Sequence, residues 1–120
     1  MNDNKLKNAA FWNVLSEISQ VEVLVELSFE TPVLIFKHSY SCGISLHVLD
    51  DFEHSFNDSD IALKPFILDL LRYRPISNFI AERFKVVHQS PQIILLKNGV
   101  VVHQASHQSI QFNDLKKYIH

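Results

Sequence analysis

Cys42 is the only cysteine among the 120 residues of the chain, and its neighbours decide what chemistry it can do. An apolar run over residues 32–36 precedes it, and a stretch with helical spacing follows it. The first amides of a helix are unpaired and its dipole favours an anion, so a thiol placed there reacts readily as a thiolate. A lone cysteine can equally be an inert, buried hydrophobic residue. The pattern leaves both interpretations open.

Three polar residues near Cys42 are candidates to stabilise a thiolate. Ser45 follows three residues later, on the same face of the first helical turn, where its hydroxyl can hydrogen-bond to the sulfur. Lys37 and His38 precede the turn and can add positive potential. Because Ser45 stands where a Cys-x-x-Cys motif has its second cysteine, a mixed disulfide on Cys42 must be resolved by an external thiol. If Cys42 is reactive, the residues around it therefore predict monothiol exchange chemistry.

Apolar runs of strand length alternate with helical patterns along the chain. The order predicts an α/β fold of thioredoxin-like arrangement, with a four-stranded mixed sheet flanked by helices. The Asn98-Gly99 pair predicts a hairpin that closes the sheet. The expected strands cover residues 32–36, 65–71, 93–96 and 100–102. The expected helices cover residues 20–28, the stretch after Cys42, the stretch from Pro75, and residues 112–119.

Two features near the amino terminus give further expectations. Phe11, Trp12 and Leu15 predict a turn of helix or an apolar lid on the domain. Ser19 and Glu22 have the spacing of a capping box at the start of the first helix.

Composition limits the class of protein. With 47% hydrophobic and 20% charged residues, residues 1–120 are expected to form one globular domain, with residues 1–10 flexible. A formal net charge of −2 argues against nucleic-acid binding, and no apolar stretch is long enough to cross a membrane. A single cysteine suits the reducing cytoplasm. No metal site is expected, because His103 and His107 lie at a strand end without other ligand motifs.

Five sequence segments together resemble the monothiol bacilliredoxins of the YtxJ type, within the thioredoxin-like superfamily. The resemblance covers about residues 12–119. The segments that carry it are Phe36-Lys37-His38-Ser39, Cys42-Gly43-Ile44-Ser45, Arg74 with Ser77, His88-Gln89-Ser90-Pro91-Gln92, and Ala105-Ser106-His107.

The resemblance implies a specific activity. Cys42 would take bacillithiol, or a similar small thiol, from mixed disulfides on proteins and pass it to another thiol, with Ser45 assisting. The small thiol is then a co-substrate, and no tightly bound cofactor is implied. The Ser90–Pro91 bond would be cis and face Cys42, as in thioredoxin-like folds. The residues expected to bind substrate are Gly43, Ser90, Pro91, Lys37, His38 and Arg74; Arg72 and Arg74 could hold carboxylates of an anionic thiol.

Two alternatives remain open. Position 43 is glycine where the family often has proline, and Cys-Gly-x-Ser with an upstream lysine is similar to monothiol glutaredoxins. That similarity implies an iron–sulfur carrier that holds a [2Fe–2S] cluster across a dimer. The other alternative is a redox-silent thioredoxin-like adaptor with a buried Cys42.

Overall fold

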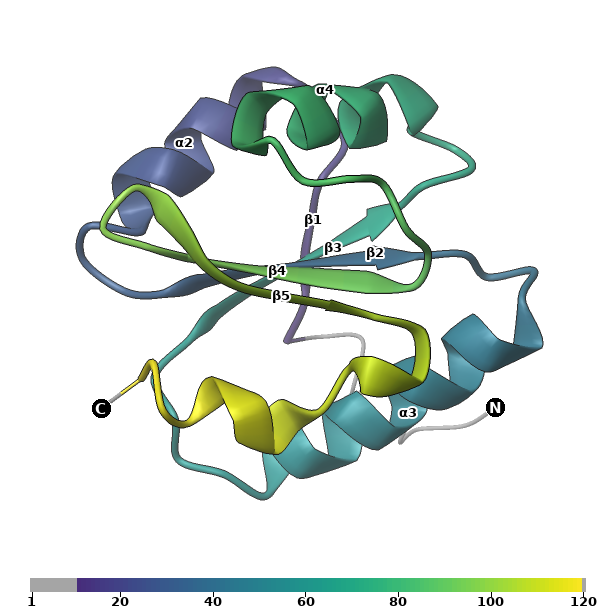
Figure 1. Ribbon diagram of the computed structural model, residues 1–120, viewed down its shortest axis with the longest axis vertical. Coiled ribbons are helices and arrows are strands. Elements are labelled where there is room, and N and C mark those ends of the chain that lie inside the picture. Colours follow the sequence, from purple (N-terminus) through teal and green to yellow (C-terminus); the bar gives the residue numbers. More distant parts are fainter. Residues whose placement is uncertain (1–10, 120) are drawn as a thin grey trace.

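The computed structural model describes residues 11–119 as a mixed sheet with helices on both faces (Figure 1). The strands follow the order β1-β3-β2-β4-β5. The strands are β1 (Asn13–Val14), β2 (Val33–His38), β3 (Lys64–Asp69), β4 (Gln92–Lys97) and β5 (Val100–Ser106). The helices are α2 (Ser19–Leu27), α3 (Gly43–Asn57) and α4 (Arg74–Phe84), with 3-10 turns η1 (His107–Ser109) and η2 (Phe112–Leu115).

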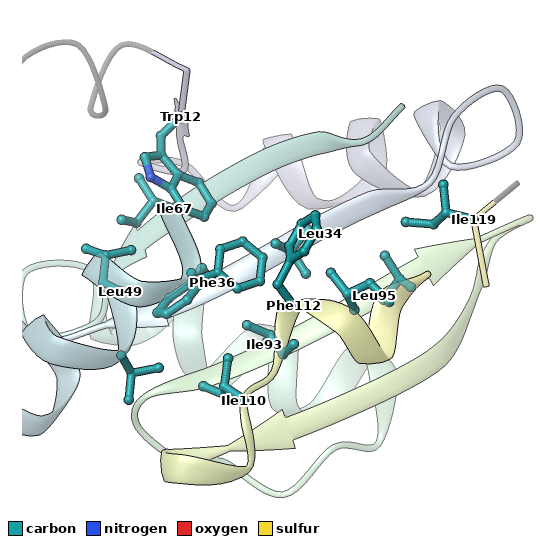
Figure 2. Close-up of a cluster of buried hydrophobic side chains, with 13 residues drawn as sticks. Trp12, Leu34, Phe36, Leu49, Ile67, Ile93, Leu95, Ile110, Phe112 and Ile119 are labelled. Carbon is teal, nitrogen blue, oxygen red and sulfur yellow. The ribbon is translucent and has the colours of Figure 1, made fainter. Parts of the chain in front are cut away.

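The central strand is β2, which pairs in parallel with β3 and antiparallel with β4. All six of its residues are buried, as expected for a strand covered on both faces. Leu34 and Phe36 belong to the cluster beneath α3 and η2, which Figure 2 shows. Val33 and Ile35 point the other way, into the cluster beneath α2 and α4. The strand ends directly before the turn that leads to Cys42.

The predicted α/β class and flanked mixed sheet are confirmed, but the sheet has one strand more than predicted. The extra strand is β1, where the sequence predicts a helical turn or lid. Its extended backbone sends Trp12 and Leu15 to opposite faces, so that each enters a different apolar cluster. The Trp12 indole nitrogen donates to Glu53 at 2.6 Å, and the Leu15 amide donates to the Ile67 carbonyl at 2.9 Å. The expected flexibility of residues 1–10 concerns residues outside the described range.

The capping box predicted for α2 is wrong. Ser19 is the first helical residue, and the residue before it makes no side-chain capping bond. The side-chain oxygen of Gln20 instead accepts from the amides of Ser16 and Glu17, at 2.8 and 2.9 Å. The Glu22 carboxylate instead forms an ion pair with Arg83, whose Nε lies 2.7 Å from it. A cross-helix ion pair and a glutamine therefore replace the expected pair of caps.

The predicted carboxy-terminal helix is also wrong in type, because residues 112–115 form a 3-10 turn. The segment still supplies apolar cover, since Phe112, Leu115 and Ile119 are buried beneath the sheet (Figure 2). The predicted hairpin is confirmed, with β4 and β5 pairing around Asn98 and Gly99.

The hairpin is fixed to the end of α2 through its backbone. Asn98 and Gly99 both have positive φ, 53° and 82°. Their amides donate to the carbonyl and the hydroxyl of Ser28, each at 2.8 Å. A Cβ on Gly99 would lie 2.7 Å from the ring of Phe29. The turn therefore needs glycine for its backbone conformation and for the space under the ring.

We predict that Gly99→Ala lowers the free energy of unfolding by about 1–2 kcal/mol from the left-handed backbone alone, with the collision at Phe29 adding to it. Gly43→Ala is the matched control, because nothing lies within 4 Å of its Cβ position and it is helical. The control should be neutral or slightly stabilising. Urea denaturation measures both variants, and equal effects would contradict the account.

Candidate functional site

Cys42 is the N-cap of α3 and carries a free, half-buried thiol. Its backbone is extended, and its carbonyl accepts the first helical bond, from the Leu46 amide at 3.0 Å. The Cys42 amide donates to the Ser39 carbonyl at 3.2 Å, which closes the turn after β2. The first turn of α3 contains no acidic residue, so no carboxylate there competes for the unpaired amides. The expected placement of Cys42 at a helix N-terminus is thus seen directly.

The topology gathers the other candidate segments at the same edge of the sheet. β2 and β3 are parallel and end there, while the antiparallel β4 begins there. Lys37 pairs with Gln92, so one step further along the ladder Pro91 lies beside His38. The Ser90–Pro91 peptide bond is cis, as expected, and Pro91 is buried with its carbonyl bonded to the His107 amide at 3.0 Å. Pro91 therefore opens β4 near the turn that carries Cys42.

The hydroxyl of Ser45 is bonded to the end of β2 and is fully buried. Its Oγ lies 2.7 Å from Nδ1 of His38 and accepts from the Ser39 amide at 3.2 Å. No hydrogen bond between the Ser45 hydroxyl and the Cys42 sulfur is seen among the described residues, so the bond expected from the sequence is not formed. Ser45 joins α3 to β2 instead.

His38 is completely buried on the α3 side of the sheet. Burial lowers the pKa of its imidazole to about 4, against a weaker opposing effect of Asp69, so the ring is neutral at pH 7. Its Nε2 is buried without a partner among the described residues. The ring packs edge-on to Tyr40, with centroids 4.1 Å apart at 84°. His38 adds no positive charge at neutral pH, contrary to the sequence interpretation.

Lys37 is completely buried on the opposite face, beneath α4. Its ammonium donates to the Ser77 carbonyl at 3.2 Å and lies 3.3 Å from Nδ1 of His88. The Ser77 hydroxyl lies 3.2 Å from the same nitrogen. Burial lowers the pKa of Lys37 to about 8, and no ion pair with an acid is seen for it in the part of the chain that the structure describes. Neither Lys37 nor His38 reaches the surface to touch a substrate.

The remaining predicted binding residues are exposed or partly exposed. Arg72 and Arg74 lie on the surface where β3 passes into α4, and Ser90 is half-buried. The charge of Arg74 contributes to a lowered pKa at His88, after burial and Lys37, so Arg74 lies near that ring. Gly43 is the first residue of α3 and has open space around its Cβ position.

The histidines do not assemble a metal centre in the described residues, where no group of three or more potential ligand side chains comes together. His107 is exposed in η1 with a positive φ of 54°. His103 lies on β5 against Tyr118, with ring centroids 5.4 Å apart.

Two surface hollows lie along α3, and neither includes Cys42. The larger, about 570 Å³, lies between the carboxy-terminal end of α3 and η2. The smaller, about 200 Å³, lies between the middle of α3 and η1. Cys42 therefore lies outside both hollows, at the start of α3.

The sequence interpretation missed the network of Lys37, Ser77 and His88, because it took Lys37 as a substrate-binding residue that adds positive potential beside Cys42. The signal was available. Lys37 continues the apolar run of β2 at the alternation that also places Val33 and Ile35 beneath α2 and α4. Its partners could not be found from the sequence, because Ser77 and His88 are 40 and 51 residues away.

Comparisons with solved structures define the class as a thioredoxin fold. A protein described as a candidate oxidoreductase with a thioredoxin fold matches with a TM-score of 0.80 and 29% identity, over 92% of this chain and 95% of that chain. Malassezia sympodialis thioredoxin matches with a TM-score of 0.68 and 16% identity, over 89% of this chain and 86% of that chain. Fasciola hepatica thioredoxin matches with a TM-score of 0.66 and 15% identity, over 88% of this chain and 94% of that chain. The last two similarities establish the fold alone.

The family follows from the sequence match. Residues 13–115 match the monothiol bacilliredoxin family BrxC, and the chain belongs to that family. The resemblance inferred from the sequence segments is thereby confirmed. Among the described residues, none of the helices combines the length and apolar character that a membrane span requires.

We predict that the buried ammonium of Lys37 makes stability rise with pH. Its pKa is about 8 in the folded protein and about 10.5 unfolded, so the unfolded state binds more protons between these values. At about 1.4 kcal/mol per pKa unit, the unfolding free energy of the native protein should rise by up to about 3 kcal/mol from pH 8 to pH 10.5, relative to Lys37→Met.

Lys64→Met is the control for this measurement, because Lys64 is exposed on β3. Urea titrations across the pH range, compared between the two variants, isolate the contribution of Lys37. A pH dependence that is identical in Lys37→Met and the native protein would contradict a buried, charged Lys37.

Proposed function

We propose that this protein is a thiol–disulfide oxidoreductase that removes bacillithiol from mixed disulfides on proteins. The observation that carries the proposal is the free thiol of Cys42 at the N-cap of α3, at a first turn without an acidic residue. Membership of the monothiol bacilliredoxin family supports thiol–disulfide exchange and bacillithiol as the co-substrate.

The reaction balances as two disulfide exchanges. The Cys42 thiolate attacks the bacillithiol sulfur of the mixed disulfide, and the substrate protein leaves as a thiolate. Cys42 then holds bacillithiol as a mixed disulfide. A second small-thiol thiolate attacks that bacillithiol sulfur, and the electron pair of the broken bond returns to the sulfur of Cys42. The disulfide moves between partners without net oxidation or reduction.

The exposed side chains around Cys42 suit a partner that is both apolar and anionic. Tyr40, Ile44 and Leu71 are each about half exposed, in the turn before α3, in its first turn and after β3. Arg72 follows that last residue and Arg74 is the first residue of α4, and both can bind carboxylates of the small thiol. An apolar surface favours a protein-borne disulfide over a free small disulfide. Gly43 is exposed and Ser90 is partly exposed at the same edge of the sheet.

The iron–sulfur alternative has less support. It rests on the glycine at position 43 and on an upstream lysine, as in monothiol glutaredoxins. Lys37 is buried against Ser77 and His88, on the face of the sheet opposite to Ser45. A side chain held there does not present its charge to a small thiol that would bind a cluster. The adaptor alternative requires a fully buried Cys42, whereas its thiol is half-buried. We propose a reducing cytoplasmic setting for the free thiol.

We predict that Cys42 gains the mass of one bacillithiol when the reduced protein is incubated with a bacillithiolated protein, while the substrate loses it. Mass spectrometry of both proteins measures the transfer, and Cys42→Ser is the control that should fold and acquire nothing. A folded native protein that never gains the adduct would refute the proposed function. Visible absorbance after anaerobic iron and sulfide reconstitution tests the iron–sulfur alternative separately.

A further inference from the structure

We propose that His38 is a positioning residue that makes the Ser45 hydroxyl a hydrogen-bond donor for the Cys42 sulfur as that sulfur becomes an anion. The inference rests on the proposed exchange reaction, because it concerns the step in which Cys42 is released from its mixed disulfide. It assigns His38 a role that differs from direct contact with the substrate.

The hydrogen bonds of Ser45 are the first observation behind this proposal. Its side chain is completely buried, and both groups that approach its oxygen come from the end of β2. The Ser39 amide can only donate, and it lies 3.2 Å from Ser45 Oγ. His38 Nδ1 lies 2.7 Å away and is either donor or acceptor, according to which nitrogen carries the proton. The direction of the Ser45 hydroxyl therefore depends on the tautomer of His38.

The other nitrogen of His38 decides between the tautomers. Nε2 is buried and has no partner among residues 11–119. A proton on Nε2 would leave a buried N–H group without an acceptor, which native proteins rarely tolerate, whereas unpaired acceptors occur somewhat more often. The favoured tautomer carries its proton on Nδ1 and donates it to Ser45.

The imidazole is neutral at pH 7, so a choice between two tautomers exists. The titratable groups that influence it are Asp69, its register partner on β3, and Tyr40, whose ring lies against it. Asp69 favours the protonated ring, but burial outweighs it. The pKa of Tyr40 is itself raised, by burial and then by Asp69 and Glu53, so its phenol is uncharged. Neither Asp69 nor Tyr40 therefore makes the His38 ring cationic at pH 7, and the ring keeps two possible neutral tautomers.

With two donors directed at its oxygen, Ser45 must use its own hydroxyl proton elsewhere. Ser45 is the third residue of α3 and Cys42 is the N-cap, so the two side chains stand on one face of the first helical turn, at the positions of the two cysteines in a Cys-x-x-Cys motif. The hydroxyl of Ser45 then donates its hydrogen bond to the sulfur of Cys42. When the mixed disulfide breaks, the electron pair passes to that sulfur, and the hydroxyl stabilises it without transferring its proton.

The test measures alkylation of Cys42 by iodoacetamide at pH 7, which needs no bacillithiol and reports thiolate reactivity directly. His38→Leu and Ser45→Ala should each slow alkylation by roughly fivefold, because a hydrogen bond to a charged group is lost and weaker intrinsic nucleophilicity offsets only part of it. His38→Asn, whose amide can donate from the same position, should restore the rate to within about twofold. The double variant should be no slower than Ser45→Ala.

Additive losses in the double variant, or an unchanged rate in His38→Leu beside a slow Ser45→Ala, would overturn the proposal. Nitrogen-15 NMR of the native protein gives a second measurement that does not depend on a variant folding. It should show the His38 proton on Nδ1, and a proton on Nε2 would overturn the proposal. If alkylation behaves as expected but no bacillithiol is transferred, the proposed function fails while this inference stands.

Discussion

The hydrogen bonds of Ser45 join the central strand to the helix that begins at Cys42, and the arrangement of the site depends on that joint. β2 is buried along its whole length, so its end is fixed in space. The Ser39 amide and His38 meet the Ser45 oxygen directly after it. A completely buried hydroxyl must keep such partners, because losing them costs the desolvation of each polar group. These bonds hold the backbone of the turn that carries Cys42 between β2 and α3.

The last two residues of β2 place polar groups on opposite faces of the sheet. His38 faces α3 and holds the joint with Ser45, while Lys37 faces α4 and binds Ser77 and His88. Both side chains are completely buried, so the apolar clusters of the two faces end in polar networks under the edge that carries Cys42. Each face of the sheet therefore has a buried polar network next to the edge that carries Cys42. The arginines and the apolar side chains around Cys42 remain exposed to partners.

The sequence predicted the features that depend on local pattern. The helix start at Cys42, the hairpin at Asn98 and Gly99, and the alternation of strands and helices all follow from spacing and residue type. The sequence did not predict the features that depend on residues far apart in the chain. The burial of Lys37 depends on partners in α4 and beyond, and the direction of Ser45 depends on a histidine whose side-chain position the spacing does not give. Lys37 and His38 were expected to add positive potential beside Cys42, but both are buried: His38 is neutral at pH 7, and the Lys37 ammonium is held by Ser77 and His88 on the other face of the sheet.

We propose that Cys42 reacts as a thiolate because of where the fold places it. The most direct measurement is the rate of Cys42 alkylation by iodoacetamide in the native protein at pH 7, compared with free cysteine under the same conditions. Cys42 should react faster than free cysteine, since the first-turn amides of α3 favour the anion. A rate equal to that of free cysteine, or below it, would contradict this placement as the cause of reactivity.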